Sequence, residues 1–224
     1  MNSKLVVTIA TITVIAILAI GIGFAYAAYT ANSNNSATPE YLIIVPSDGE
    51  SAPAYSQTFD NSVTFDTVTI LDQGVQKVKY SLSDYDTISG HRYAALGQIY
   101  LAVNESKSAE DYKVSAIVED GTGLNTTDYS YYAFMQIGSG ETEADARDAA
   151  EQAEGSLVQL TLSSGDMVAT SGTIDNDPDN GFSVVLLTMY VALSGGDEYI
   201  KPLSTPLSPT VLNAVTFMFK AETA

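Results

Sequence analysis

The chain contains no cysteine and no tryptophan, and it has a single histidine, His91. Without cysteine there is no disulfide, no thiolate nucleophile and no cysteine-bound metal, and one histidine cannot build a histidine cluster for zinc. Basic residues are scarce as well, because 9 Lys and Arg stand against 27 Asp and Glu, a formal net charge of −18 over 224 residues. This balance excludes a basic nucleic-acid-binding protein, and we predict no nucleic-acid partner.

Hydrophobic residues, in contrast, make up 46% of the chain, and charged residues only 16%. A charge-rich disordered protein is therefore excluded too. Once the first forty or so residues are set aside, the remaining length suffices for one domain with a sizeable core. Because no disulfide can staple it, such a domain must depend on that core for its stability.

The first thirty residues carry one charge, Lys4, followed by an uncharged apolar run from Leu5 to Ala28. At about 1.5 Å per residue, a helix of this length crosses a hydrocarbon core of roughly 30 Å. The positive-inside rule then places Lys4 in the cytoplasm and the later residues outside. We predict a signal or transmembrane helix over 1–28, a polar flexible tether over 29–40 and an extracellular domain over 41–224.

The sequence leaves open whether this helix is cleaved. Ala25, Ala27 and Ala28 supply the small residues that a signal peptidase reads, which favours cleavage. The apolar run is longer than the usual signal core of about 7 to 15 residues, which favours an uncleaved anchor with the membrane as partner through residues 5–28. Both alternatives export the domain, to the cell surface or into an extracellular filament.

Beyond residue 40 the dominant hydrophobic period is two. Val215, Phe217 and Phe219 alternate with polar or exposed-type neighbours, which predicts a strand with one buried face. Residues that favour strands also fill the runs 41–45, 63–70, 75–82, 99–103, 130–137 and 182–193, with turn-like segments between many of them. We predict an all-β fold, an antiparallel β-sandwich or jelly roll of nine or ten strands.

One segment departs from this pattern. Glu141 to Glu154 is acidic and rich in alanine, with alanines near helical spacing and Gly155 at its end. It predicts one short helix capped by Gly155. Because only alanines lie on its inner face, we expect it to bury little area and to lie on the sandwich as a crossover.

Two kinds of binding or modification site can be proposed from short patterns. Asp175, Asp177 and Asp179 alternate as carboxylates do in a calcium loop, but the segment lacks the EF-hand glycine and glutamate positions, so a solvated turn is the competing interpretation. Calcium is the only cofactor that the sequence suggests. Asn34, Asn104 and Asn125 begin Asn-x-Ser/Thr tripeptides, and export makes them candidate glycosylation sites.

Recognised catalytic motifs are absent, including a phosphate loop, Gly-x-Ser-x-Gly and His-Glu-x-x-His. Asp84 and Asp86 are paired carboxylates of the kind that a glycosidase uses, but such pairs arise freely in a chain with 27 acidic residues. We predict that the protein is not an enzyme. A secreted hydrolase would require two carboxylates that converge in a cleft.

Both ends of the chain carry patterns that recur in exported β proteins. Gly21-Ile-Gly-Phe-Ala-Tyr-Ala-Ala-Tyr29 runs glycines and small residues into an Ala-aromatic sequence, and a long strand candidate at 182–193 is followed by a proline-bearing loop and a last strand at 215–221. In these features the chain resembles the camelysin/TasA family. Thr30-Ala31-Asn32 departs from that family, which has an acidic residue after the aromatic one.

The resemblance implies a jelly roll that polymerises into matrix fibres or bundling pili, in which each subunit completes its neighbour with its N-terminal strand. Self-association is therefore the expected partnership. The metallopeptidase label that some family members carry does not extend to this chain, because His91 stands alone.

Tyr41, Leu42, Ile43, Ile44 and Val45 form an apolar strand candidate directly after the tether, and this is the candidate donor strand. An open sheet edge presents unpaired backbone groups that a strand from another subunit can satisfy. The competing interpretation is that the segment is the ordinary first strand of its own sheet. Two functions remain: a self-assembling fibre or pilus subunit that uses donor-strand exchange, and a membrane-anchored monomeric β-sandwich adhesin or binding module.

Overall fold

In the computed structural model the chain divides into two compact units, residues 1–32 and 33–224. The structure describes residues 40–224 except 61, 108–109, 120–123, 205–206 and 208–214. The predicted N-terminal helix, its cleavage region at Ala25, Ala27 and Ala28, and Asn34 lie outside these residues. Within them, no helix has the length and apolar character that a membrane crossing needs.

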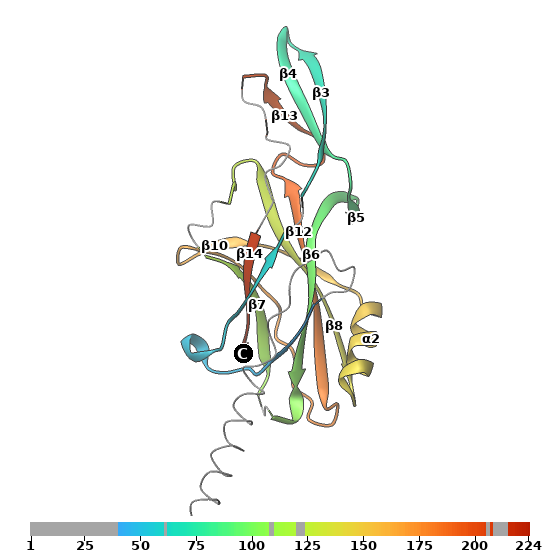
Figure 1. The fold of residues 1–224 in the computed structure, drawn as a ribbon, viewed down its shortest axis with the longest axis vertical. Coiled ribbons are helices and arrows are strands. Elements are labelled where there is room, and N and C mark those ends of the chain that lie inside the picture. Colours follow the sequence, from blue (N-terminus) through green and yellow to red (C-terminus); the bar gives the residue numbers. More distant parts are fainter. Residues whose placement is uncertain (1–39, 61, 108–109, 120–123, 205–206, 208–214) are drawn as a thin grey trace, which may run out of the picture. The chain divides into compact units, whose positions relative to one another are not determined.

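The described residues are mostly β-strand, with one α-helix and two short 3-10 turns (Figure 1). The elements are β1 (Glu40–Ile44), η1 (Gly49–Ser51), β2 (Tyr55–Phe59), β3 (Phe65–Asp72), β4 (Val75–Leu82), β5 (Asp86–Ile88), β6 (His91–Asn104), η2 (Glu105–Lys107), β7 (Tyr112–Val118), β8 (Tyr129–Gly140), α2 (Glu143–Gln152), β9 (Ser156–Gln159), β10 (Thr161–Ser163), β11 (Asp166–Thr170), β12 (Phe182–Leu193), β13 (Tyr199–Pro202) and β14 (Val215–Thr223).

These strands form three sheets. Sheet A has the order β1-β6-β12-β8-β9, with β5 paired to the start of β6, and sheet B has the order β10-β11-β7-β14-β2. Sheet C, with the order β13-β4-β3, is a separate three-stranded sheet beyond one end of the sandwich (Figure 1). All named pairings are antiparallel except that of β1 with β6. The predicted all-β sandwich is confirmed.

Three tight hairpins share one turn chemistry. Gln73-Gly74 joins β3 to β4, Ser89-Gly90 joins β5 to β6, and Ser164-Gly165 joins β10 to β11, and every one of these residues has a positive φ. Two consecutive positive φ angles define the turn whose twist matches that of paired strands, and glycine at the second position lowers its cost. Short polar turns with glycine therefore fix the register of each hairpin.

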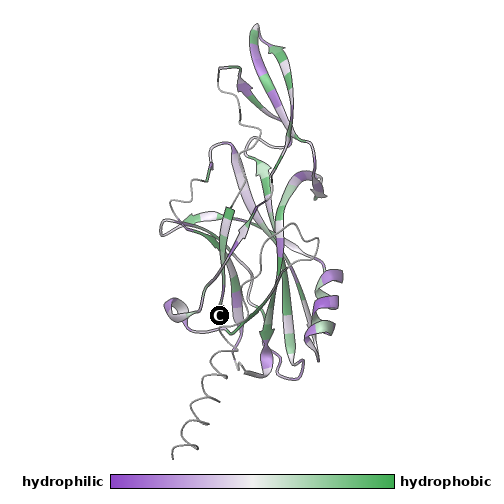
Figure 2. Ribbon diagram, in the orientation of Figure 1, coloured by the Kyte–Doolittle hydropathy of each residue, from purple (hydrophilic) through white to green (hydrophobic). Residues whose placement is uncertain are grey.

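The main core lies between sheets A and B. Phe217 and Phe219 of β14 are fully buried, and the Phe59 ring of β2 lies 5.7 Å from that of Phe217, centroid to centroid. From sheet A, the central strand β12 contributes Leu187 and Met189, both without exposed surface. Figure 2 shows hydrophobic residues along much of β6, β7 and β12. The period-two pattern in β14 thus marks the buried face, as predicted.

Helix α2 covers the outer face of sheet A. Thr142 caps its N-terminus, because its Oγ1 accepts a hydrogen bond from the backbone N–H of Asp145 at 3.2 Å. Ala146 and Ala150 are fully buried against β8 and β12. A Cβ added at Gly138 of β8 would lie 2.1 Å from the Ala150 backbone nitrogen. The helix therefore packs closely because both contact surfaces carry minimal side chains.

Candidate functional site

Strand β1 lies at the edge of sheet A, where β6 is its one partner among the described strands. The pairing is parallel and covers five residues, with Ile43 opposite Ala102 and Ile44 opposite Val103. Leu42 is 2% exposed and Ile44 fully buried, whereas Ile43 is 44% exposed. The predicted donor strand therefore occupies an edge position in its own sheet, inserts alternate side chains into the core, and has no hairpin that ties it to β6.

The residues after β1 are held to the rest of the domain. Ser47 forms a bridge with Glu222 near the end of β14, and the Thr223 Oγ1 donates a hydrogen bond to Asp48 Oδ1 at 3.0 Å. Val45 and Pro46 lie between this attachment and β1. Any movement of β1 away from β6 would consequently pivot at these two residues.

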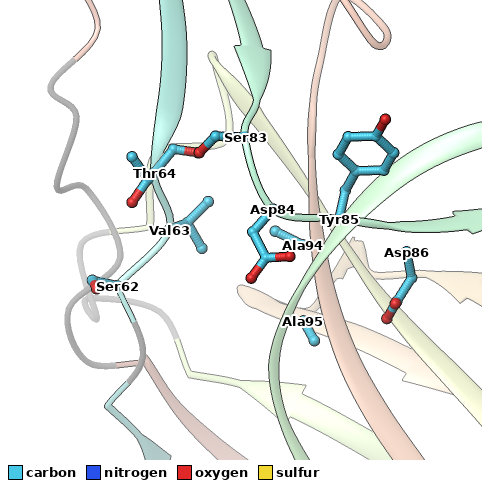
Figure 3. Close-up of a pocket in the computed structure, with 9 residues that line it drawn as sticks. All are labelled: Ser62, Val63, Thr64, Ser83, Asp84, Tyr85, Asp86, Ala94 and Ala95. Carbon is cyan, nitrogen blue, oxygen red and sulfur yellow. The ribbon is translucent and has the colours of Figure 1, made fainter.

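A polar cavity of about 410 Å³ lies where β4 leads into β5, next to β6. Its walls come from residues 62–64 before β3, residues 83–86 after β4, and Ala94 and Ala95 of β6 (Figure 3). Asp84 lies between these walls, and the Ser83 Oγ donates a hydrogen bond to the Thr64 carbonyl at 3.0 Å. Asp84 and Asp86 both line the cavity, which therefore offers two carboxylates in a polar setting.

Asp86 is the other half of the carboxylate pair noted in the sequence, and it has a different partner. Its Oδ2 accepts a hydrogen bond from the Tyr190 hydroxyl at 2.8 Å. Burial, together with this bond, raises the pKa of Tyr190 above its ordinary value. Because Asp86 holds a tyrosine of β12, it is engaged in packing β5 against sheet A, and nothing in this geometry assigns the pair acid and base roles.

The predicted calcium segment forms the turn that precedes β12. The Asp177 Oδ1 accepts a hydrogen bond from the Asp179 backbone N–H at 3.1 Å, as in an ordinary polar turn. Among the described residues, no three Asp, Glu or His side chains come together in a group that could hold a metal ion. The structure thus gives no support to a site at Asp175, Asp177 and Asp179.

Next to this turn, Glu105 of η2 is 1% exposed, and its Oε2 has no hydrogen-bond partner among the described residues. Burial is the largest effect on the pKa of Glu105, and it raises that pKa. A hydrogen bond from the Asp177 backbone acts in the opposite direction, and the negative charge of Asp177 adds to the increase. No local pattern marks this buried acid, because Glu105 follows an apolar strand as many surface residues do.

Two of the three candidate glycosylation sites are described. Asn104 ends β6, and its Oδ1 accepts a hydrogen bond from the Ser106 hydroxyl at 2.6 Å. Asn125 lies in the turn before β8, where its Oδ1 accepts hydrogen bonds from the backbone N–H groups of Thr127 and Asp128, both at 3.1 Å. Its Nδ2, the atom that a glycan would modify, donates to Asp128 Oδ2 at 2.8 Å.

Asp128 connects this turn to sheet C. Its side chain, 10% exposed, forms an ion pair with Lys201 of β13, whose side chain is 16% exposed. The Tyr199 hydroxyl donates a longer hydrogen bond to Asp128 Oδ1 at 3.4 Å. One carboxylate therefore contacts the Lys201 amine through one oxygen and the Asn125 amide through the other.

Aromatic side chains lie on one side of this cluster, next to Asp128. Burial by itself disfavours the charge of Asp128, but hydrogen bonds from Lys201 and Asn125 outweigh it and hold the pKa of Asp128 below its ordinary value. Burial, with the charge of Asp128, raises the pKa of Tyr129 to about 12. The hydroxyl groups of Tyr129 and Tyr131 are buried without a hydrogen-bond partner in the described part of the chain.

Sequence reasoning brought out Asn125 as a glycosylation candidate and missed its two neighbours. Lys201 and Asp128 are 73 positions apart and come together only because β13 joins sheet C while β8 belongs to sheet A. No spacing rule marks such a pair, so only the folded structure could reveal it.

No known protein family matches the chain, and no characterised protein matches it in sequence. Among solved structures, the enzymatically active domain of tailspike protein 4 from bacteriophage CBA120 is similar at 5% identity and a TM-score of 0.24, covering 66% of this chain and 19% of that one. The chain thus spans about a fifth of the tailspike domain.

Two further solved structures overlap more completely in length. A desmodium yellow mottle tymovirus protein aligns at 9% identity and a TM-score of 0.22, over 85% of this chain and 93% of that one. The collagen-binding subdomain of the Enterococcus faecalis surface protein ACE aligns at 13% identity and a TM-score of 0.17, over 71% and 94%. At these scores the similarities carry no argument about function.

Proposed function

We propose that the protein is an exported cell-surface structural protein, a self-assembling fibre or pilus subunit in which β1 completes sheet A of a neighbouring copy. This is the role that the resemblance to the camelysin/TasA family implies. The alternative is a membrane-anchored, monomeric β-sandwich adhesin or binding module, in which β1 stays in its own sheet.

The observation that supports the proposal is the position of β1. A strand at a sheet edge, parallel to its only neighbour and joined to it by no hairpin, can be supplied by another chain without changing the rest of the topology. Leu42 and Ile44 fill the core from this strand, so its removal would expose apolar surface that a copy of β1 would cover again. In the alternative, the monomeric module, β1 pairs with β6 of its own chain.

The absence of cysteine makes the two possibilities separable by disulfide cross-linking. Ile43 and Ala102 face each other across neighbouring strands, about 5 Å apart, a separation that a disulfide can bridge. Chains with only Ile43→Cys would be mixed with chains carrying only Ala102→Cys under assembly conditions and then oxidised. Donor-strand exchange predicts a disulfide between the two kinds of chain. When both substitutions are in one chain, it predicts a series of disulfide-linked oligomers of increasing size.

A matched control uses two strands that the proposal keeps within one chain. Thr58 of β2 and Thr216 of β14 face each other, with their hydroxyl oxygens 2.8 Å apart on the exposed side. Mixed Thr58→Cys and Thr216→Cys chains should give no disulfide between chains. If Ile43→Cys and Ala102→Cys link only within a double variant and never between mixed chains, β1 is not exchanged and the monomeric module is the better description.

The charge of the chain supplies a second test. All 27 acidic residues follow residue 38, so copies of the outside domain repel one another. Fibre growth, followed by electron microscopy and light scattering, should increase with ionic strength or with calcium because both screen that repulsion. Assembly that does not form at any ionic strength would favour the alternative.

A further inference from the structure

Lys201, Asp128 and Asn125 form a partly buried cluster, centred on the buried Asp128, whose geometry suits a covalent reaction. We propose that Lys201 and Asn125 become joined by an intramolecular isopeptide bond, which the folded chain forms by itself with Asp128 as the proton carrier. The bond would link sheet C covalently to the turn before β8. This modification is independent of whether β1 is exchanged between copies.

The nucleophile is the Lys201 amine. A lysine amine attacks only in its neutral form, so a neighbouring base has to take its proton. The Lys201 side chain is only 16% exposed and contacts the Asp128 carboxylate, which is placed to accept its proton.

The electrophile is the Asn125 side-chain carbonyl. Its Oδ1 accepts hydrogen bonds from two backbone N–H groups, those of Thr127 and Asp128, each at 3.1 Å. Two fixed backbone donors on one carbonyl oxygen are the arrangement that stabilises the negative charge of a tetrahedral intermediate. The turn before β8 therefore supplies an oxyanion hole as part of its own hydrogen bonding.

The leaving group is the Asn125 Nδ2, which already donates a hydrogen bond to Asp128 Oδ2 at 2.8 Å. The Lys201 Nζ–Asn125 Cγ bond forms and the Cγ–Nδ2 bond breaks. Asp128 takes protons from Nζ and delivers them to Nδ2. Because Nζ loses two protons and Nδ2 gains both, ammonium leaves and Asp128 returns to its carboxylate form. No oxidant or further reactant is needed.

Hydrogen bonds and aromatic side chains next to Asp128 hold these groups in place. The Tyr199 hydroxyl reaches Asp128 Oδ1, and the buried Tyr129 hydroxyl lies close enough to feel the charge of Asp128. Fixing a nucleophile next to its electrophile replaces a bimolecular encounter by an intramolecular one.

The test is the intact mass of the purified full-length chain, compared with Lys201→Arg. Arginine preserves the ion pair with Asp128, so the variant should fold, but its guanidinium does not acylate. We expect the wild-type mass to be lower than the sequence mass by one ammonia and the variant to have its full sequence mass. A proteolytic digest should contain a branched peptide that joins the segments around 125 and 201.

Asn125→Ala and Asp128→Ala should also restore the full mass. Lys79→Arg is the matched control, since Lys79 forms a more exposed ion pair with Glu198 at 2.6 Å in the same sheet, and it should leave the ammonia loss unchanged. A folded wild-type chain with its full sequence mass overturns the proposal. Loss of one water in place of ammonia also overturns it, because the amine would then have reacted with Asp128.

Discussion

The contact between α2 and sheet A gives a sharp prediction about stability. A Cβ at Gly138 would lie 2.1 Å from the backbone nitrogen of Ala150 and 2.5 Å from the carbonyl oxygen of Ala146, whereas ordinary contact begins near 3.4 Å. Both are backbone atoms, so no side chain can rotate away. The Gly138→Ala variant must therefore push the helix off β8 by roughly 1 Å, the difference between these distances.

The cost follows from the packing that is lost. Displacement opens the contact of Ala146 and Ala150 with Tyr100, Val184 and Leu186, which together form the buried cluster under the helix. Insertion of extra atoms into a packed interior typically costs about 1–3 kcal/mol. For a domain of this size, each kcal/mol corresponds to about 2–4 °C, so a loss near 2 kcal/mol lowers Tm by about 4–8 °C.

Gly172→Ala is the matched control. Nothing lies within 4 Å of a Cβ at Gly172, and its φ is not in the left-handed region. Both variants remove one glycine and so restrict the unfolded chain equally. Thermal and urea denaturation would give both stabilities, and hydrogen exchange would show faster exchange in α2 for Gly138→Ala alone. Equal Tm values for the two variants would refute the idea that glycine is required for the helix contact.

Three further results are expected. Because burial raises the pKa of Glu105 above its ordinary value of 4.5, the folded state binds more protons there than the unfolded state, and this contribution to stability declines as pH rises through the folded pKa. Glu105→Gln should therefore be more stable than wild type in urea denaturation at neutral pH, with the difference vanishing near pH ~4. Phe217→Ala should lower the free energy of unfolding by about 3–5 kcal/mol, because the ring is fully buried between Phe59 and Phe219. Leu162→Ser, at a side chain that is 74% exposed, should change it by less than about 0.5 kcal/mol in the same assay.

The local hydrophobic pattern was sufficient to predict the strands whose side chains are buried in a regular way along their length. The run 182–193 coincides with β12, which is buried on both faces, and 75–82 coincides with β4. The alternation at 215–221 marks the buried face of β14 correctly. In each of these strands, the side chains report directly on burial, so the hydrophobic sequence carries the structural information.

Other boundaries depend on partners that sequence pattern does not reveal. β6 begins at His91, well before the predicted 99, because β5 and β12 pair with a stretch that contains Gly97 and a register shift near Met189. The short strands β2, β5, β11 and β13 have mixed sequences and exist through pairing with longer neighbours. Helix α2 ends with Ala153 as its C-cap and not at Gly155, whose missing side chain makes room for the Phe134 ring.

The candidate sites also differ in whether a local sequence pattern reveals them. The apolar strand at 41–45 was visible because it follows a polar stretch, and the structure places it at a sheet edge. The cluster of Lys201, Asp128 and Asn125 depends on contacts between residues far apart in sequence, for which no local signal exists.

The place of β14 in sheet B sets the order in which the domain can fold. β14 lies between β2 and β7, and its pairing with β2 joins Thr58 to Thr216, residues 158 positions apart. Sheets built on such distant contacts fold in milliseconds to seconds, because long loops must close before the contacts stabilise them. Sheet B therefore cannot close until residues near 220 are available, and the earlier strands stay unpaired on that side. During this time the formal net charge of −18 makes unfolded copies repel one another, which opposes pairing between their strands.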